Sequence, residues 1–142
     1  MPADDSADSG ARVGAGRTVL LVEDNLHNRR IFAGILTHYG FVVQEAHNGV
    51  EAVEMAPGVA PDLILMDLSL PEMDGWEATR RIKAMPELAR VPVVALTAHA
   101  MEGDEDRARE AGCDGYLAKP ISPKQLVSEV ARFLERHGAG GR

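Results

Sequence analysis

Five short, largely apolar runs, separated by longer segments of helical period, constrain the fold of this chain more than any other feature. Runs of four to six such residues are typical of strands buried on both faces of a sheet. Strands that alternate with helices form a parallel sheet covered by helices on each side. We therefore predict an α/β fold with strands at TVLLV (18–22), FVVQEA (41–46), LILM (63–66), VPVVAL (91–96) and GYLA (115–118).

The segments that follow the five runs predict five helices. The first carries Phe32, Ile35, Leu36 and Tyr39 at the i, i+3, i+4, i+7 spacing of one helix face, and Asn25 is its expected N-cap. The other helices are expected at 49–56 (ended by Pro57), 75–85, 103–112 and 123–137.

This βα pattern predicts a doubly wound, five-stranded parallel sheet. By analogy with small domains of this class, we adopt the flavodoxin-like (βα)5 type with strand order 2-1-3-4-5. A chain of 142 residues with 45% hydrophobic content is expected to form one domain. We place that domain at 17–137. Tails at 1–16 and 138–142, in which Gly, Ala and polar residues predominate, are predicted to be disordered.

Composition excludes several classes of function. The net charge of −7 argues against a nucleic-acid footprint, and the pair Arg29-Arg30 is interpreted as a solvated helix face. The single cysteine, Cys113, suits a reducing compartment and is expected to be a small buried residue. The sequence shows no signal peptide and no membrane-spanning run. We predict a cytoplasmic protein that binds neither nucleic acid nor membrane.

Polar residues follow four of the five apolar runs directly. They are Glu23-Asp24 after the first run, Asp67 after the third, Thr97 after the fourth and Lys119 after the fifth. The carboxyl ends of parallel strands lie at one edge of the sheet, where open α/β sheets bind ligands. These five side chains are therefore expected to share a cleft.

Three carboxylates in one cleft repel one another, and one lysine does not balance them. Oxygen ligands without Cys or His suit a hard divalent cation, Mg²⁺ with Mn²⁺ as an alternative. A central carboxylate beside a metal ion, an ammonium group and a hydroxyl has the parts that are needed to receive a phosphoryl group. The pattern thus predicts that Asp67 is a phosphoacceptor, assisted by Thr97 and Lys119.

The sequence also resembles a known family. From about residue 17 to residue 137, the chain is similar to the receiver domains of two-component response regulators. The likeness is carried by VLLVEDN, LILMDLSLPEMDGWE, VPVVALTAHAM and GYLAKPIS, in that order. It implies that Glu23 and Asp24 hold the metal with Asp67 and the backbone carbonyl of Ser69. It also implies a switch pair, Thr97 and Tyr116, although Tyr116 reads almost equally well as a half-buried core aromatic.

The resemblance carries further expectations about geometry and partners. The Lys119–Pro120 peptide is expected to be cis, and His99 is a candidate for tuning the lifetime of the phosphoryl group. The partners implied are a histidine kinase or a histidine phosphotransferase, and a downstream protein at the face of the fourth helix, fifth strand and fifth helix. More narrowly, the chain is similar to single-domain regulators of the DivK type, which act in bacterial cell-cycle signalling. Such a protein is a switch with at most slow autodephosphorylation, not an enzyme.

Three alternatives compete with a free-standing regulator. The chain could be a receiver domain cut from a hybrid histidine kinase, which shares the same motifs. A flavodoxin-like flavin-binding protein is disfavoured, because the acids of EDN (23–25) would repel a phosphate. A phosphatase with an aspartyl nucleophile would carry a second acid two residues after the first, where this chain has Ser69.

Overall fold

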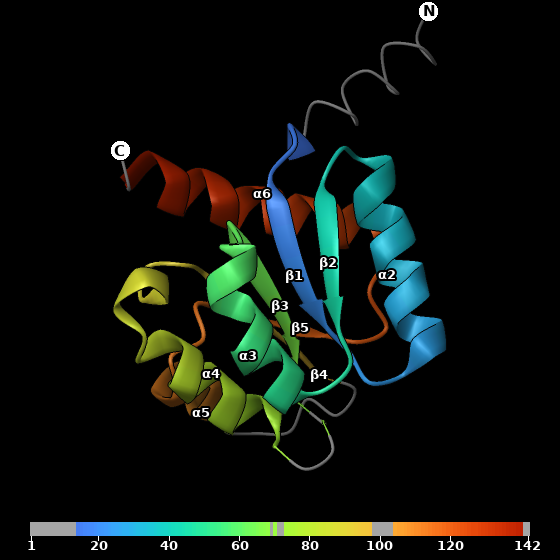
Figure 1. Cartoon of the computed structure of the whole chain (residues 1–142). Helices are drawn as coiled ribbons and strands as arrows, with labels where there is room; N and C mark the ends of the chain where they lie inside the picture. Colours follow the sequence, from blue (N-terminus) through green and yellow to red (C-terminus); the bar gives the residue numbers. More distant parts are fainter. Residues whose placement is uncertain (1–13, 69, 71–72, 98–103, 141–142) are drawn as a thin grey trace, which may run out of the picture.

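The predicted sheet is present, with the predicted strand order. The computed structural model describes residues 14–68, 70, 73–97 and 104–140. Five parallel strands pair in the order β2-β1-β3-β4-β5 (Figure 1). Their bounds are β1 Thr18–Val22, β2 Val42–Ala46, β3 Leu63–Asp67, β4 Val93–Thr97 and β5 Gly115–Ala118.

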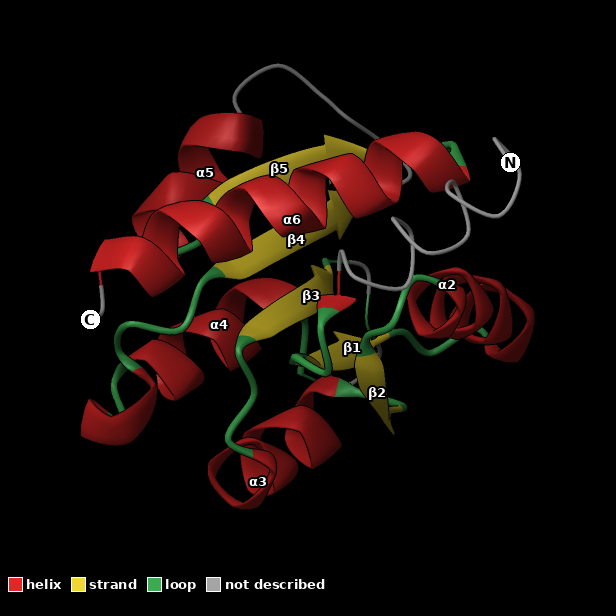
Figure 2. Ribbon diagram, turned by 90° about the horizontal axis from the view of Figure 1, so that it is seen from above, coloured by secondary structure: helices red, strands yellow, loops and turns green. Residues whose placement is uncertain are grey.

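Helices cover both faces of this sheet. α3, α4 and α5 lie on one face, and α2 and α6 lie on the other (Figure 2). A short 3₁₀ helix, η1, which the sequence did not predict, leads from α4 into β4. The bounds are α2 Leu26–His38, α3 Gly49–Val59, α4 Gly75–Lys83, η1 Pro86–Leu88, α5 Asp104–Ala111 and α6 Pro123–Gly140.

Strand alternation divides the buried side chains into two cores, because successive residues of a strand point to opposite faces. In β3, Leu63 and Leu65 pack with α2 and α6, whereas Ile64 and Met66 pack with α3, α4 and α5. All four are fully buried, as expected for a central strand of a parallel sheet. We call the two sides the α2/α6 face and the α3–α5 face.

Helix ends differ from the sequence prediction by one to three residues, most at α3 and α6. α3 does not end before Pro57 but runs to Val59, where Ala60 adopts a left-handed conformation and donates its N–H to the carbonyl of Ala56. A proline removes one helical hydrogen bond, and in the last turn that loss does not stop the helix. α6 runs to Gly140, three residues beyond its predicted end. Among the described helices, none has an apolar stretch long enough to cross a bilayer.

Side-chain caps begin the helices that follow the carboxyl ends of β1, β2 and β3. Asn25, Asn48 and Asp74 each accept a hydrogen bond from the backbone N–H three residues later. The predicted cap at Asn25 is confirmed, with 2.9 Å between its Oδ1 and the nitrogen of Asn28. These caps fix where each of the three helices begins.

Candidate functional site

Three carboxylates meet at the carboxyl edge of the sheet. Glu23 and Asp24 follow β1, and Asp67 ends the neighbouring strand β3. One oxygen from each lies within 4.8 Å of the others. Asp24 is exposed, whereas Glu23 and Asp67 are only 1% and 3% exposed. The predicted acidic cluster is therefore formed, with one solvent-exposed carboxylate and two buried ones.

Lys119 brings a positive charge into this cluster from the end of β5, two strands away from β3. Its Nζ lies 2.8 Å from Oε1 of Glu23 and 3.7 Å from Oδ2 of Asp67. Its backbone N–H donates to the carbonyl of Thr97 at 2.7 Å, which extends the β4–β5 ladder by one residue. The Lys119–Pro120 peptide is cis, as predicted. The lysine is thus positioned by the sheet and touches both buried acids.

Thr97 ends β4 beside Asp67 but belongs to the other face. Asp67 pairs in register with Leu96, so the two lie on the α2/α6 face, whereas Thr97 follows Val93 and Ala95 onto the α3–α5 face. Thr97 is buried. The same alternation carries Lys119 to the α2/α6 face, where its Nζ lies 5.9 Å from the centre of the Phe32 ring.

Glu23 has a raised pKa, chiefly because its side chain is buried. Burial raises this pKa from 4.5 to about 7. The hydrogen bond from Lys119 opposes the rise, and the hydrogen bond and negative charge of Asp67 add to it. The metal-free site therefore holds a proton on Glu23 at pH values where an ordinary glutamate is ionised.

Local contacts hold the acidic residues at this edge. The backbone N–H of Asn25 donates to Oε2 of Glu23 at 3.2 Å, so the residue that caps α2 also orients the acid two positions earlier. On the β3 side, Gly75 begins α4 against the strand end. A Cβ at this position would lie 2.4 Å from the carbonyl oxygen of Asp67. Glycine therefore allows α4 to start directly beside the proposed acceptor.

The sequence interpretation of Arg29 is wrong. Its side chain is only 8% exposed, and it donates from Nε to Glu45 and from Nη1 to the backbone carbonyl of Glu23. Arg30 is exposed, as predicted. The helical period indicates the burial of Arg29, because this residue precedes the buried Phe32 and Leu36 by three and seven positions and so lies on the same helix face.

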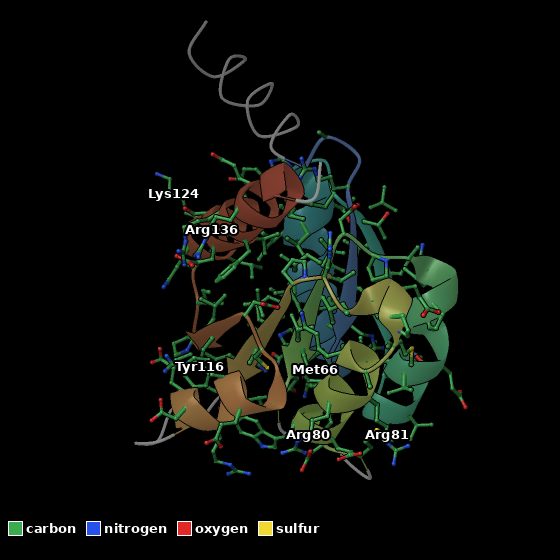
Figure 3. All side chains as sticks on the ribbon, turned by 90° about the vertical axis from the view of Figure 1, so that its left-hand side faces the viewer. Met66, Arg80, Arg81, Tyr116, Lys124 and Arg136 are labelled. Carbon is green, nitrogen blue, oxygen red and sulfur yellow. The ribbon has the colours of Figure 1, made fainter. Side chains whose placement is uncertain are left out.

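Other predicted site residues stand apart from the carboxylates or lie outside the described residues. Ser69 and His99 belong to the second group. Tyr116 is half-buried and packs against the α3–α5 core, beside α5 (Figure 3). With Ala108 and Cys113 it lines a hollow of about 120 Å³ between α5 and β5. Cys113 is buried as predicted, and burial raises its thiol pKa to about 11.

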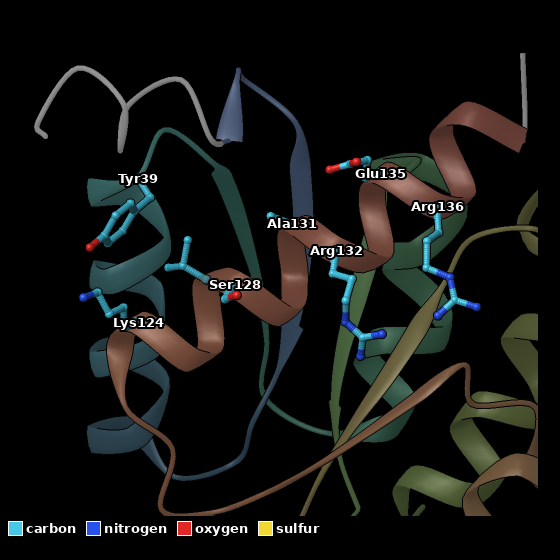
Figure 4. Close-up of a pocket in the computed structure, with 8 residues that line it drawn as sticks. Tyr39, Lys124, Ser128, Ala131, Arg132, Glu135 and Arg136 are labelled. Atoms are coloured by element: carbon cyan, nitrogen blue, oxygen red, sulfur yellow. The ribbon is translucent and has the colours of Figure 1, made fainter. Parts of the chain in front are cut away.

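A larger groove lies elsewhere on the molecule. It has a volume of about 410 Å³ and lies between α6 and the end of α2, lined by residues that include Tyr39, Lys124 and Arg136 (Figure 4). Its lining contains none of the three carboxylates, nor Thr97 or Lys119. The carboxylates at the strand ends therefore lie apart from the residues that line this groove.

The donor set at that edge fits a hard divalent cation. Glu23, Asp24 and Asp67 offer carboxylate oxygens only, and one of the three is open to solvent. Mg²⁺ is commonly bound by one or two carboxylates together with waters and phosphate oxygens. The exposed Asp24 leaves the site accessible from solvent, so a cation could keep part of its hydration shell.

Comparison with known proteins gives the same family at the level of sequence and of structure. Residues 19–131 match the model of the response regulator receiver domain. The polar-differentiation response regulator DivK of Brucella anthropi is 42% identical over 118 residues, which cover 83% of this chain and 96% of that protein. This similarity confirms the predicted resemblance to DivK-type regulators.

Solved structures agree. The receiver domain of the sensor histidine kinase PA1611 from Pseudomonas aeruginosa is 40% identical, with a TM-score of 0.79, and covers 84% of this chain and 98% of that one. It was solved with a magnesium ion coordinated in its active-site cleft. The chemotaxis protein CheY4 of Vibrio cholerae is 26% identical, with a TM-score of 0.80, over 83% of this chain and 98% of that one. This chain belongs to the response regulator receiver domain family.

Proposed function

We propose that the chain accepts a phosphoryl group on Asp67 from a histidine kinase or a histidine phosphotransferase, and then signals through an altered protein-binding surface. The observation that carries the proposal is the convergence at Asp67. Its carboxylate lies within 4.8 Å of oxygens of Glu23 and Asp24, and 3.7 Å from the ammonium group of Lys119. Receiver domains are phosphoacceptor switches, and these are the parts that such a transfer needs.

In the proposed step, a carboxylate oxygen of Asp67 attacks the phosphorus of a phosphohistidine in line. The new O–P bond forms as the P–N bond breaks, and the electron pair of that bond stays on the imidazole nitrogen. Lys119 and the hydroxyl of Thr97 bind oxygens of the transferred group. A bound Mg²⁺, held by Glu23, Asp24, Asp67 and the carbonyl of Ser69, would supply the charge that neutralises the phosphoryl oxygens. The magnesium of the PA1611 receiver domain supports this assignment.

For the output, we propose that Thr97 moves towards the new phosphoryl group and that Tyr116 turns inward behind it. Both residues lie on the α3–α5 face by strand alternation, and Tyr116 borders the 120 Å³ hollow between α5 and β5. The expected result is a changed surface formed by α5, β5 and α6, where a downstream protein binds. A phosphoryl mimic should therefore shift the amide NMR signals of α5 and β5. Unchanged signals there would contradict this route.

The DivK relative is 42% identical over 96% of its length, which supports a DivK-type role, and the receiver domain of the kinase PA1611, 40% identical, supports the hybrid-kinase alternative. A role like that of DivK in cell-cycle signalling belongs to the same proposal. The family match removes support for the flavin-binding alternative. The cytoplasmic location stays a prediction from the sequence.

The decisive test is the intact mass of the protein after incubation with acetyl phosphate, with and without Mg²⁺. The wild type should gain one phosphoryl group in a metal-dependent manner, and Asp67→Asn should gain none. Slow loss of the added mass is expected after the donor is removed. Glu54→Gln, an exposed acid on α3, is the matched control and should behave as the wild type does. A gain retained by Asp67→Asn would place the acceptor elsewhere.

A further inference from the structure

We propose that Arg29 is a positioning residue of the metal site. It fixes the turn between β1 and α2 so that Glu23 and Asp24 stay aimed at Asp67. The inference rests on the proposed function, because it concerns the same cation. It assigns to a buried helix residue an effect on metal affinity, although that residue holds no metal ligand atom.

The contacts of Arg29 join three elements. From the first turn of α2, its Nη1 donates to the carbonyl of Glu23 at 3.0 Å, beyond the end of β1. Its Nε donates to Oε1 of Glu45 on β2, also at 3.0 Å. The side chain is 8% exposed, whereas that of Glu45 is 40% exposed. Glu45 of β2 thus positions the guanidinium group, which in turn fixes the backbone carbonyl just after β1.

The carbonyl that Arg29 holds is the peptide oxygen between the two acids. Fixing this peptide plane limits the directions in which the side chains of Glu23 and Asp24 leave the backbone. Without a cation, repulsion among three carboxylates favours splaying them apart. The hydrogen bond from Nη1 of Arg29 opposes that movement, because breaking it would leave a buried N–H donor unsatisfied. Arg29 therefore preorganises the turn for a cation.

The sign of the effect separates positioning from simple electrostatics. Arg29 adds one positive charge near a cation site, so its charge alone should weaken Mg²⁺ binding, and removing it should tighten binding. If Arg29 acts by positioning, its removal should weaken binding instead. Loss of a partner that orients metal ligands typically lowers metal affinity about 10- to 100-fold. The two explanations thus predict opposite changes in one measured constant.

The test is Mg²⁺ titration of purified variants by isothermal calorimetry, with urea unfolding of each variant measured without Mg²⁺. Arg29→Met keeps the apolar stem and removes the charge, and the partner that it leaves, Glu45, is 40% exposed and so stays in contact with solvent. We expect its Mg²⁺ dissociation constant to rise about 10- to 100-fold. Arg30→Met removes the same charge from the neighbouring exposed position and should keep the wild-type constant or bind slightly more tightly. Folded Arg29→Met with a wild-type or lower constant would overturn the inference.

Arg29→Lys decides the question if the methionine variant does not fold. A lysine ammonium group cannot reproduce the forked geometry that reaches both Glu45 and the carbonyl of Glu23. Its dissociation constant should rise several-fold, and a wild-type value would overturn the inference. Failure of the proposed function looks different, because the wild type itself would then bind no Mg²⁺ or gain no phosphoryl group. In that case the parent site is absent, whatever the Arg29 variants do.

Discussion

At the scale of single residues, Glu23 is where a proton would compete with the proposed cation. It is almost fully buried, it touches Lys119 at 2.8 Å, and its pKa is raised to about 7. In the unfolded chain its pKa is near 4.5, so between these values the folded state holds a proton that the unfolded state has released. Raising the pH from 4.5 to 7 therefore destabilises the metal-free fold.

This competition predicts that Mg²⁺ binding depends on pH. Binding requires the carboxylate form of Glu23, so the apparent affinity should fall as the pH drops below about 7, approaching tenfold per pH unit. Calorimetric titrations at pH 8, 7 and 6 would measure it. Glu23→Gln should bind more weakly and lose most of this dependence. A constant wild-type affinity from pH 8 to pH 6 would contradict the role given to Glu23.

Much of the site could be predicted from single residues, because the ends of the strands can be recognised in the sequence. Glu23, Asp67 and Lys119 are the first polar residues after apolar runs, and a parallel sheet brings such positions to one edge. Arg29 was missed because an arginine beside a second arginine resembles a solvated pair. The helical period places it on the buried face with Phe32 and Leu36, but its partners, Glu45 and the backbone carbonyl of Glu23, lie outside α2 and could not be predicted from that period.

At the scale of elements, the start of α4 depends on one close approach. A Cβ on Gly75 would lie 2.4 Å from the carbonyl oxygen of Asp67 and 2.8 Å from the Cα of Leu68. Both contacts are with backbone, so α4 or the end of β3 would have to move. We predict that Gly75→Ala destabilises the fold by about 1–3 kcal/mol, the usual cost of overpacking.

Urea unfolding of Gly75→Ala would measure this cost, and Gly58→Ala is its control. Gly58 lies inside α3, and a Cβ added there would meet no atom within 4 Å. Alanine there should leave stability unchanged or raise it by up to about 1 kcal/mol, because alanine is the better helix former. Equal losses in the two variants would refute the close approach.

A second contact between elements ties α4 to α5. The guanidinium carbon of Arg107 lies 4.5 Å from the centre of the ring of Trp76, the single tryptophan of the chain. Such a contact is worth roughly 0.5–2 kcal/mol, depending on solvent exposure. α5 otherwise has few apolar residues, so we predict that Arg107→Ala speeds amide hydrogen exchange in α5 and changes the emission of Trp76.

Arg109→Ala serves as the control for that prediction. Arg109 forms ion pairs only with Glu105 and Asp106 among the described residues, and both lie on α5. Its loss should leave the Trp76 emission as in the wild type. If both variants changed the emission equally, the contact across α4 and α5 would not be responsible.

The bounds of the elements were predictable to within a few residues, with identifiable exceptions. Pro57 predicts a helix end, but α3 continues to Val59 because the last turn tolerates one missing donor. η1 was not predicted, since three residues are too few to show a period. Helix ends and short turns depend on individual hydrogen bonds, and apolar patterns do not report these.

At the scale of the whole molecule, two cores share one sheet. Leu36 is fully buried on the α2/α6 face, and Ile82 is fully buried on the α3–α5 face. We predict that Leu36→Ala and Ile82→Ala each cost about 2–5 kcal/mol in the free energy of unfolding. Because the strands belong to both cores, each variant should unfold in a single transition.

Urea unfolding followed by far-ultraviolet circular dichroism and by Trp76 fluorescence would check this. The two probes should coincide, although Trp76 reports the α3–α5 face alone. Leu26→Ala, which alters an exposed residue at the start of α2, should change stability little. Separate transitions for the two probes would show that the faces unfold independently.

Right-handed crossovers leave few arrangements of five parallel strands, and the order was predicted by analogy with the flavodoxin-like one among them. The alternation within each strand has a further consequence. By this alternation Glu23, Asp67 and Lys119 lie on the α2/α6 side of the sheet edge, whereas Thr97 and Tyr116 lie on the α3–α5 side. Of the residues proposed to contact the phosphoryl group, Thr97 alone therefore belongs to the α3–α5 side, so substitutions elsewhere on that side could alter partner binding without changing the carboxylates or the lysine.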